Sequence, residues 1–410
     1  MTSEQIGILA SGMLAMLATA AIGLSLLASL KPQRLVGDEH EYLSPERNRP
    51  TAGNWIRVPL FRWILSPARG NAGTARHLLV WLNALFAGIA AAIAASLAGP
   101  VAGILGGLLL ALCLERGLLS IHAWPDVILG GLLVIFAVLL IEPSIPHRWL
   151  LAGCAASLSL SIRIDSGILV PVAAGIAIWR EPDWGTPLLA FLLPVVLTLL
   201  ALSIFNGMRH GVWLPDTTLA FNLRVARNEL AAPSDATVQD LMSATVRETR
   251  SGNRRQAPPI ASWRLAGRSM HAYVRRLQTF LGKETFCTQR LIQNNPAQYR
   301  GGHVLGHAGL LRLNLRYGFS LLAAGFLALS GYLDPALIVI TGAVMLSSTL
   351  IQTRSRYRAS LIPTLAVFLS VALVDVIAGA PVNMPRAVCG VVGSSLVMLL
   401  VLLPGARAEH

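Results

Sequence analysis

Long apolar stretches alternate with a few polar segments along the whole chain. A helix needs about 20 apolar residues to cross a bilayer, and eleven stretches approach that length. We predict helices near 6–30, 77–98, 101–121, 126–142, 149–163, 165–180, 186–206, 317–332, 335–351, 359–378 and 387–404. Segments 149–163 and 165–180 meet at RIDSG, which indicates a broken helix or a tight hairpin. The pattern predicts an all-α polytopic membrane protein with about eleven transmembrane helices.

The polar residues gather in two long loops and one short run. The loops, 31–76 and 207–316, and the run TRSRYR at 353–358 carry 8, 16 and 3 of the 33 basic residues, and by alternation they lie on one membrane face. We divide the chain into an N-terminal transmembrane module (1–206) with the acidic loop 31–76, a loop subdomain (207–316), and C-terminal transmembrane helices (317–410). The apolar spacing within 258–292 indicates amphipathic helices on the membrane surface, or a packed helix of an extramembrane subdomain.

Composition supports a membrane protein and narrows the class of its partners. Hydrophobic residues make up 54% of the chain and charged residues 13%, whereas soluble domains carry roughly 25% charged residues. The net charge is +13, and the basic residues are 31 Arg and 2 Lys. Arginine binds phosphate in a planar, two-pronged way, so we expect membrane lipids and lipid-linked phosphates as partners, and no nucleic acid. An arginine bias in a G+C-rich genome is the alternative explanation of the excess.

The first loop begins with a cluster of acids. In GDEHEYLSPE, four carboxylates lie at Asp38, Glu39, Glu41 and Glu46, directly behind the first apolar segment. A carboxylate at a membrane surface can take a proton from an acceptor hydroxyl or hold a divalent cation against a phosphate. The alternative is an acidic loop that is merely solvated.

Further charged residues lie at the ends of apolar segments. Asp126 begins a predicted helix in HAWPDVILGG, where the helix dipole favours a carboxylate. Arg163 and Asp165 lie in SIRIDSG between apolar segments, and ionisable residues at such depth usually face an interior or a wet cavity. A helix cap at Asp126 and a purely structural pair of Arg163 with Asp165 are the alternatives.

Two stretches on the same face combine arginine with aromatic residues, HGVWLPDTTLAFNLRVARNE at 210–229 and RSRYRASLIP at 354–363. Both are typical of anchors at the membrane interface. Both also suit a lipid phosphate, because charge-assisted arginine contacts are the strong option for that group.

In combination these motifs resemble the GT-C superfamily of membrane glycosyltransferases, in the branch of protein O-mannosyltransferases and lipid A aminoarabinose transferases. The likeness runs from residue 1 to about 365, although ARNE stands where the family often has Gly-Asn-Asn. The matching residues are Asp38, Glu39 and Tyr42 for its D-E-x-x-Y, Asp126 for its PD-type acid, Arg163 and Asp165 for its R-x-(D/E)-(G/S) break, Asn222, Leu223 and Asn228 for its N-L-x-x-x-x-N, and Arg356, Tyr357 and Arg358 for its R-Y-R run.

The resemblance implies a GT-C-type helix bundle and a concrete activity. A sugar would move with inversion from a polyprenyl-phosphate donor to an extracytoplasmic glycan, lipid or protein acceptor. Asp38 would be the general base, while Glu39 and Asp126 would orient the acceptor or hold a divalent cation, Mg or Mn. The implied contacts of the donor phosphate are Arg163, Arg356, Tyr357 and Arg358. The implied substrate contacts are Tyr42, His122, Asn222, Arg227 and Asn228.

Two arguments about orientation disagree. The positive-inside rule places the arginine-rich face in the cytoplasm, although long loops escape this rule. The resemblance instead implies the bacterial inner membrane, with the N-terminus in the cytoplasm and the acidic loop facing the periplasm. No basic residue precedes segment 6–30, so we expect a retained first helix rather than a cleaved signal peptide.

Two other classes of function compete with this one. A transporter or flippase of a lipid-linked or anionic solute would use the arginines and the interior Arg163–Asp165 pair, but transporters usually show internal repeats. A glycan polymerase or ligase acting on lipid-diphosphate donors suits the large loop and the many arginines. Such enzymes do not rely on an acidic pair after the first helix, so the substitution Asp38→Asn discriminates.

Overall fold

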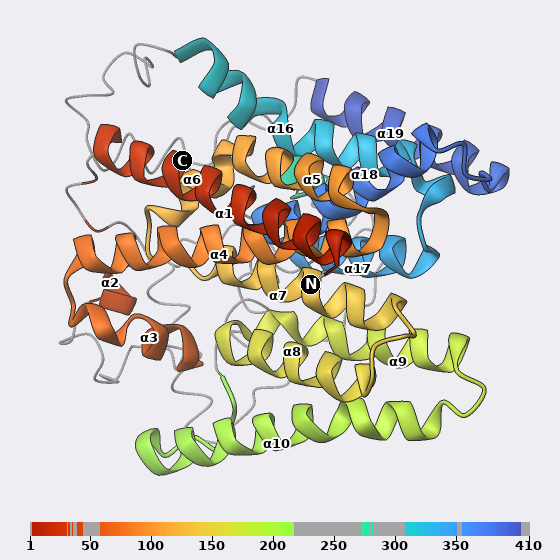
Figure 1. Ribbon diagram of the computed structural model, residues 1–410. Helices are drawn as coiled ribbons and strands as arrows, with labels where there is room; N and C mark the ends of the chain where they lie inside the picture. The colour runs from red at the N-terminus through yellow and green to blue at the C-terminus, as the bar shows by residue number, and fades with distance from the viewer. Residues whose placement is uncertain are drawn as a thin grey trace.

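The structure is a computed structural model, and it describes residues 2–30, 32, 35, 39–43, 58–216, 273–274, 276–278, 280–281, 308–350 and 355–402. Within these ranges every regular element is a helix, and no strand is present. Most of the long helices run roughly along one common direction (Figure 1). The prediction of an all-α fold is therefore confirmed for this part of the chain.

Three N-terminal helices, α1 (Ser3–Leu30), α4 (Ala72–Ala98) and α5 (Pro100–Leu112), pack against one another. Small residues line their contacts: a Cβ added at Gly12 would lie 3.1 Å from the carbonyl oxygen of Gly88, and one at Gly107 would lie 2.6 Å from the Cβ of Ala15. Such residues let helix backbones approach closely in a membrane, where van der Waals contact drives helix association.

The predicted helix 101–121 is broken in the structure. Helix α5 ends at Leu112, α6 (Leu114–Ser120) follows, and the two are bent by 63°. Asn314 of α16 (Ala308–Ala328) satisfies the backbone at the break, because its Oδ1 accepts from Leu114 N at 3.1 Å and its Nδ2 donates to the Leu112 carbonyl at 2.8 Å. Non-helical backbone at membrane depth is tolerated only where it is satisfied in this way or by water.

The central helix α7 (Asp126–Ile141) is buried along almost its whole length, and α8 (Arg148–Ile162) packs against it. The short 3-10 helix η3 (Ile164–Ile168) separates α8 from α9 (Leu169–Arg180), so the break expected at RIDSG is present. The long helix α10 (Gly185–His210) returns beside α8.

The C-terminal part adds α17 (Pro335–Leu350), α18 (Ile362–Ile377) and α19 (Met384–Leu402), together with the short 3-10 helices η4 (Ser330–Tyr332) and η5 (Ser355–Ser360). Helix α18 packs onto α4, α5 and α7, and α19 packs onto α16. At the other end of the bundle lie α2 (Glu39–Leu43), α3 (Leu60–Ile64) and η2 (Ser66–Ala68). Phe280 and Leu281, two described residues of the predicted surface helices in 258–292, are buried in the core of the bundle.

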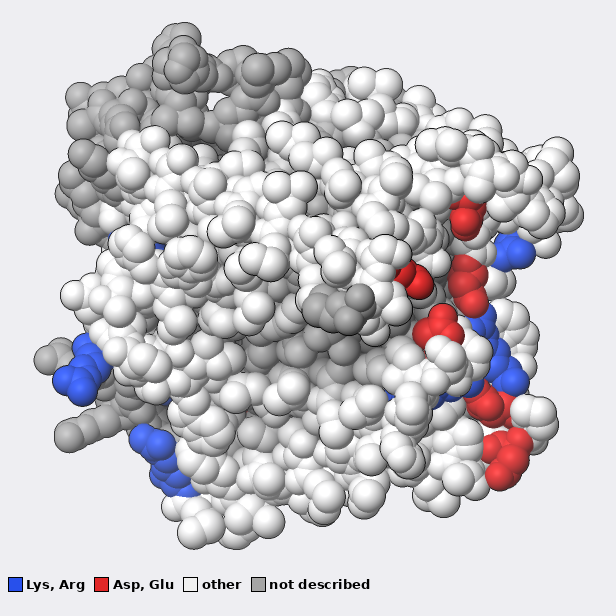
Figure 2. Space-filling view, in the orientation of Figure 1, with Lys and Arg blue, Asp and Glu red and all other residues white. Residues whose placement is uncertain are grey.

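Among the helices that the structure describes, four (α1, α4, α10 and α19) are long and apolar enough to cross a membrane, and the bent pair α5–α6 gives a fifth if it counts as one span. Large apolar side chains are exposed along α1, α10 and α19. Charged side chains gather toward the two sides of the view in Figure 2 and leave a broad uncharged band between them. The chain therefore has the character of a multi-pass membrane protein.

The predicted number of eleven transmembrane helices is not confirmed. Helical elements lie over each of the eleven predicted ranges, but several of them are short. Helix α7 has 16 residues and α8 has 15, whereas a straight span needs about 20. Apolar runs alone do not distinguish such buried helices from helices that span the bilayer.

Candidate functional site

Helix α2, which follows the first helix, is docked onto the start of α7 through Glu39. Glu39 of α2 is fully buried, and its Oε1 accepts a hydrogen bond of 3.0 Å from the Ala123 N–H, 84 residues away in sequence. The same oxygen lies 3.5 Å from Arg76 Nη2 and 3.5 Å from His122 Nδ1. Arg76 also donates to the Pro32 carbonyl at 2.5 Å. Two predicted site residues, Glu39 and His122, are thus neighbours.

The charge state of Glu39 follows from these contacts. Burial alone raises the pKa of Glu39, because a carboxylate loses its water. The hydrogen bond and charge interaction with His122, the charge of Arg76 and the Ala123 N–H outweigh burial and hold the pKa below its ordinary value of 4.5. Glu39 is therefore a carboxylate at neutral pH and a weak proton acceptor, which favours a positioning role over that of general base.

A second charged group is centred on Arg163. Asp126, the first residue of α7, is fully buried, and its Oδ1 accepts a hydrogen bond of 2.6 Å from Arg163 Nη1. Arg163 also donates to Asp165 through Nε at 3.0 Å and through Nη2. The guanidinium carbon lies 4.2 Å from the centre of the Tyr357 ring. The extended backbone of Arg163, at φ −149° and ψ 123°, ends α8 at this point.

A pocket opens beside Arg163, between residues of α7, α8, η3, α17 and η5. It encloses about 440 Å³ of space free of protein atoms, its open mouth included. We call it the serine pocket. Its polar wall is formed by Ser159, Arg163, Asp165, Ser166, Ser347, Ser348, Tyr357 and Ser360.

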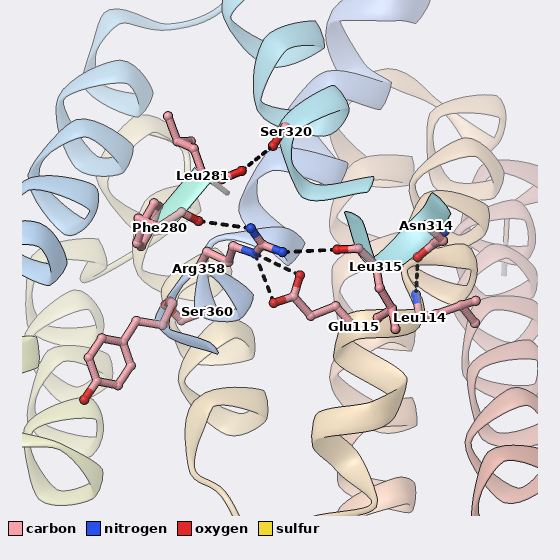
Figure 3. Close-up of polar contacts among 10 residues, drawn as sticks. Leu114, Glu115, Phe280, Leu281, Asn314, Leu315, Ser320, Arg358 and Ser360 are labelled. Carbon is pink, nitrogen blue, oxygen red and sulfur yellow. Dashed lines mark hydrogen bonds and ion pairs between the residues drawn. The ribbon is translucent and has the colours of Figure 1, made fainter. Parts of the chain in front are cut away.

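Arg358 does not line this pocket but lies in the protein interior (Figure 3). Its Nε lies 3.0 Å and 2.9 Å from the two carboxylate oxygens of Glu115. Its Nη1 donates to the Phe280 carbonyl at 3.1 Å, and its Nη2 to the Leu315 carbonyl at 3.3 Å. The guanidinium therefore ties η5, α6, α16 and the 280–281 stretch together, and we do not assign it to a donor phosphate.

Two buried ionisable residues were not singled out from the sequence. Glu115, the partner of Arg358, is followed by Arg116 in α6. Arg116 donates from Nε to Asn83 Oδ1 at 2.5 Å and from Nη2 to the Val127 carbonyl at 3.3 Å. A signal was available, because an acid and an arginine inside an apolar segment of a membrane protein are expected to face its interior.

The other predicted site residues are placed as follows. The Tyr42 ring packs edge-on against Phe61, with 4.7 Å between ring centres, and the His122 ring stacks on Trp124 at 5.0 Å. Neither Tyr42 nor His122 lines the serine pocket, so their contact with a substrate stays a prediction. The predicted residues outside the described part are Asp38, Asn222, Arg227 and Asn228, and Arg356 is described only as backbone of η5.

The predicted divalent cation does not fit the described carboxylates. Glu39 already faces Arg76 and His122, and Asp126 faces Arg163. No group of three or more potential metal ligands gathers in the part of the chain that the structure describes. We therefore derive no step through a metal ion.

Comparisons of the chain with protein-family models, with curated proteins and with solved structures each found no match.

Proposed function

We propose that this chain is an integral membrane glycosyltransferase of the inner membrane that moves a sugar from a polyprenyl-phosphate donor to an extracytoplasmic glycan, lipid or protein acceptor. The observation that carries the proposal is the docking of Glu39 onto His122 and Ala123. This contact brings Glu39 and α2 to the end of α7 where Asp126 binds Arg163 beside the serine pocket. Acids next to a pocket at the end of a bundle of apolar helices suit proton removal from a hydroxyl.

Asp38 is the general base in this proposal, and Glu39 positions it. Asp38 directly precedes Glu39 in the chain, and Glu39 is the member of this acidic pair that the structure describes. Glu39 itself is held by Arg76, His122 and the Ala123 N–H. The resemblance to the GT-C superfamily supports the same assignment.

The step is a displacement at the anomeric carbon. Asp38 takes the proton of the acceptor hydroxyl, and the acceptor oxygen forms the new bond to that carbon. The bond from the carbon to the phosphate oxygen breaks, and its electron pair leaves with the lipid phosphate. Among the predicted phosphate contacts, Arg163 and Arg358 already bind carboxylates. We therefore assign the departing phosphate to Arg356, as electrostatic stabilisation of developing charge.

The test is turnover of purified protein in lipid nanodiscs. A panel of radiolabelled polyprenyl-phosphate sugars serves as donors, with membrane extract as the acceptor. The variant is Asp38→Asn, and the matched control is Asp183→Asn, in the exposed connection between α9 and α10 at the far end of the bundle (Figure 1). We expect Asp38→Asn to lower turnover by about 10²-fold or more, as for loss of a general base, and the control to match the wild type.

Equal turnover of Asp38→Asn and the wild type would contradict Asp38 as the base. A transporter is the second candidate, because the interior Asp126–Arg163 and Glu115–Arg358 pairs are of the kind that line solute pathways. Binding of the donors without any turnover, together with their movement across a vesicle membrane, would favour that candidate over transfer. Turnover that needs a lipid-diphosphate donor would favour a glycan polymerase or ligase.

A further inference from the structure

The hydroxyl groups of the serine pocket are oriented by helix backbone. Ser159 Oγ donates to the Ala155 carbonyl at 2.9 Å, and Ser347 Oγ donates to the Val344 carbonyl at 3.0 Å. Ser360 Oγ donates in the same way to the Tyr357 carbonyl at 2.9 Å. A hydroxyl has one proton and two lone pairs. Because these protons bond to backbone, the three hydroxyls offer lone pairs, and they act as acceptors toward a ligand.

The charges beside the pocket also favour a ligand that donates hydrogen bonds. Arg163 lines it, but three of its nitrogens bond to Asp126 or Asp165 and its flat face covers the Tyr357 ring. One guanidinium thus faces two carboxylates. The Asp165 side chain is 32% exposed, so its carboxylate is accessible to a ligand. Arg358, the next residue after Tyr357, binds Glu115 away from the pocket and adds no free positive charge.

Among the described residues, the three serine hydroxyls and Asp165 thus offer acceptors, and the charge of Arg163 with its two carboxylate partners sums to negative. A phosphate or carboxylate brings only acceptors and a negative charge, so these lone pairs and Asp165 disfavour it. A sugar with hydroxyl or amino groups brings the donors that these acceptors need. Repulsion of the wrong ligand is as effective a source of specificity as attraction of the right one.

We propose that the serine pocket binds the sugar of the lipid-linked donor, that it selects a non-anionic sugar over a uronic acid, and that Asp165 and Ser347 carry this selection. The identity of the ligand as the donor sugar rests on the proposed function. The chemical selection rests on the pocket alone. The phosphate of the donor then lies outside the pocket.

A binding experiment tests the selection without any need for transfer. The probes are three short-chain isoprenyl phosphates that carry glucose, glucosamine or glucuronic acid in the same linkage. Glucose and glucuronic acid differ only by a hydroxymethyl group against a carboxylate. Affinities are measured by the shift of thermal unfolding of the full chain in detergent, for the wild type, Asp165→Asn and Ser347→Ala.

We expect the glucose and glucosamine probes to bind about fivefold more tightly than the glucuronic acid probe, as for one partly exposed like-charge contact after screening. Asp165→Asn, whose amide oxygen still accepts from Arg163, should shrink that ratio. Ser347→Ala should weaken glucose binding about fivefold, as for one lost hydrogen bond. Equal or tighter binding of the glucuronic acid probe to the wild type, an unchanged ratio in Asp165→Asn, or no binding of any probe would overturn the proposal.

The two proposals fail separately in this design. Selective binding without turnover in the transfer assay would contradict the glycosyltransferase and leave the pocket's selection supported. Turnover with a preference for the uronic acid donor would support the glycosyltransferase and contradict the selection proposed for the pocket.

Discussion

Glu39 shows how one residue can join distant segments of this protein. Its carboxylate has a backbone donor from Ala123 and two side-chain partners, Arg76 and His122, which come from two other elements. When one charge of a buried group of interacting charges is removed, the folded protein loses several kcal/mol of stability, because the remaining charges stay buried without a partner of opposite sign. The docking of α2 onto the start of α7 therefore depends on this one side chain.

The substitution Glu39→Gln tests this dependence. The amide still accepts from Ala123, but Arg76 loses the carboxylate that faces it, at an expected cost of about 3 kcal/mol. The unfolding temperature in detergent should fall at pH 7, while Asp183→Asn, an exposed position, should unfold like the wild type.

The stability difference between the wild type and Glu39→Gln should depend on pH. The pKa of Glu39 is lowered in the folded protein from its ordinary value of 4.5, so the unfolded chain binds more protons in the range below that value. The stabilisation by Glu39 is complete above 4.5 and is lost as the pH falls through the folded pKa. The gap in unfolding temperature between wild type and Glu39→Gln should therefore close below pH 4.5. A gap that stays constant would contradict the role of the charge.

Arg358 and Glu115 form a buried ion pair whose contribution to stability can be measured. The substitution Arg358→Met leaves the Glu115 carboxylate without the guanidinium that it faces, at an expected cost of about 3–5 kcal/mol. The double variant Glu115→Gln, Arg358→Met should regain part of that loss, measured as a double-mutant cycle of unfolding temperatures. Additive losses would mean that the two side chains do not interact.

The site was only partly predictable from its residues. Asp126 and Arg163 stood out because they are charged groups at the ends of apolar segments, and the structure joins them at 2.6 Å. The partners of Arg358 could not be predicted, because Glu115, Phe280 and Leu315 come from three segments far apart in sequence. Only folding shows that Arg358 of the R-Y-R run lies in the interior.

At the scale of elements, apolar runs predicted where helices lie but not where they bend. The bend between α5 and α6 depends on Asn314, which lies about 200 residues later in the chain. The sequence around Cys113 contains no pattern from which the contact with Asn314 could be predicted. The lengths of the helices could not be predicted from the apolar runs either, since α7 and α8 are apolar but too short to count as membrane spans.

The substitution Asn314→Leu tests the role of this asparagine. It removes the acceptor for the Leu114 N–H and the donor for the Leu112 carbonyl, each at an expected cost of about 1–3 kcal/mol if the group stays unsatisfied. Asn314→Asp keeps the acceptor but sets a carboxylate oxygen against the Leu112 carbonyl oxygen, so it should lose at least as much stability. Unfolding temperatures of both variants in detergent check this order, and an unchanged temperature for Asn314→Leu would mean that the bend does not need it.

At the scale of the whole molecule, orientation is the property on which charge and resemblance disagree. Ser66 and Ser144 are exposed and lie at opposite ends of the bundle, beside α3 and between α7 and α8 (Figure 1). In a chain whose four native cysteines are replaced by alanine, we expect a membrane-impermeant maleimide to label Ser66→Cys in intact cells. Ser144→Cys should be labelled only after permeabilisation. The reverse pattern would agree with the positive-inside rule and contradict an extracytoplasmic acceptor.

If transfer takes place where Glu39 of α2 meets the start of α7, turnover should depend on Asp126, and the variant Asp126→Asn measures this dependence. The new amide still accepts from Arg163, and Arg163 keeps Asp165 as its charged partner, so the fold should persist, which the unfolding temperature verifies. We predict that donor turnover in nanodiscs falls about 10²-fold, as for a reacting group displaced from its position, while Asp183→Asn matches the wild type. Full turnover by a folded Asp126→Asn would contradict the account and place the chemistry elsewhere in the chain.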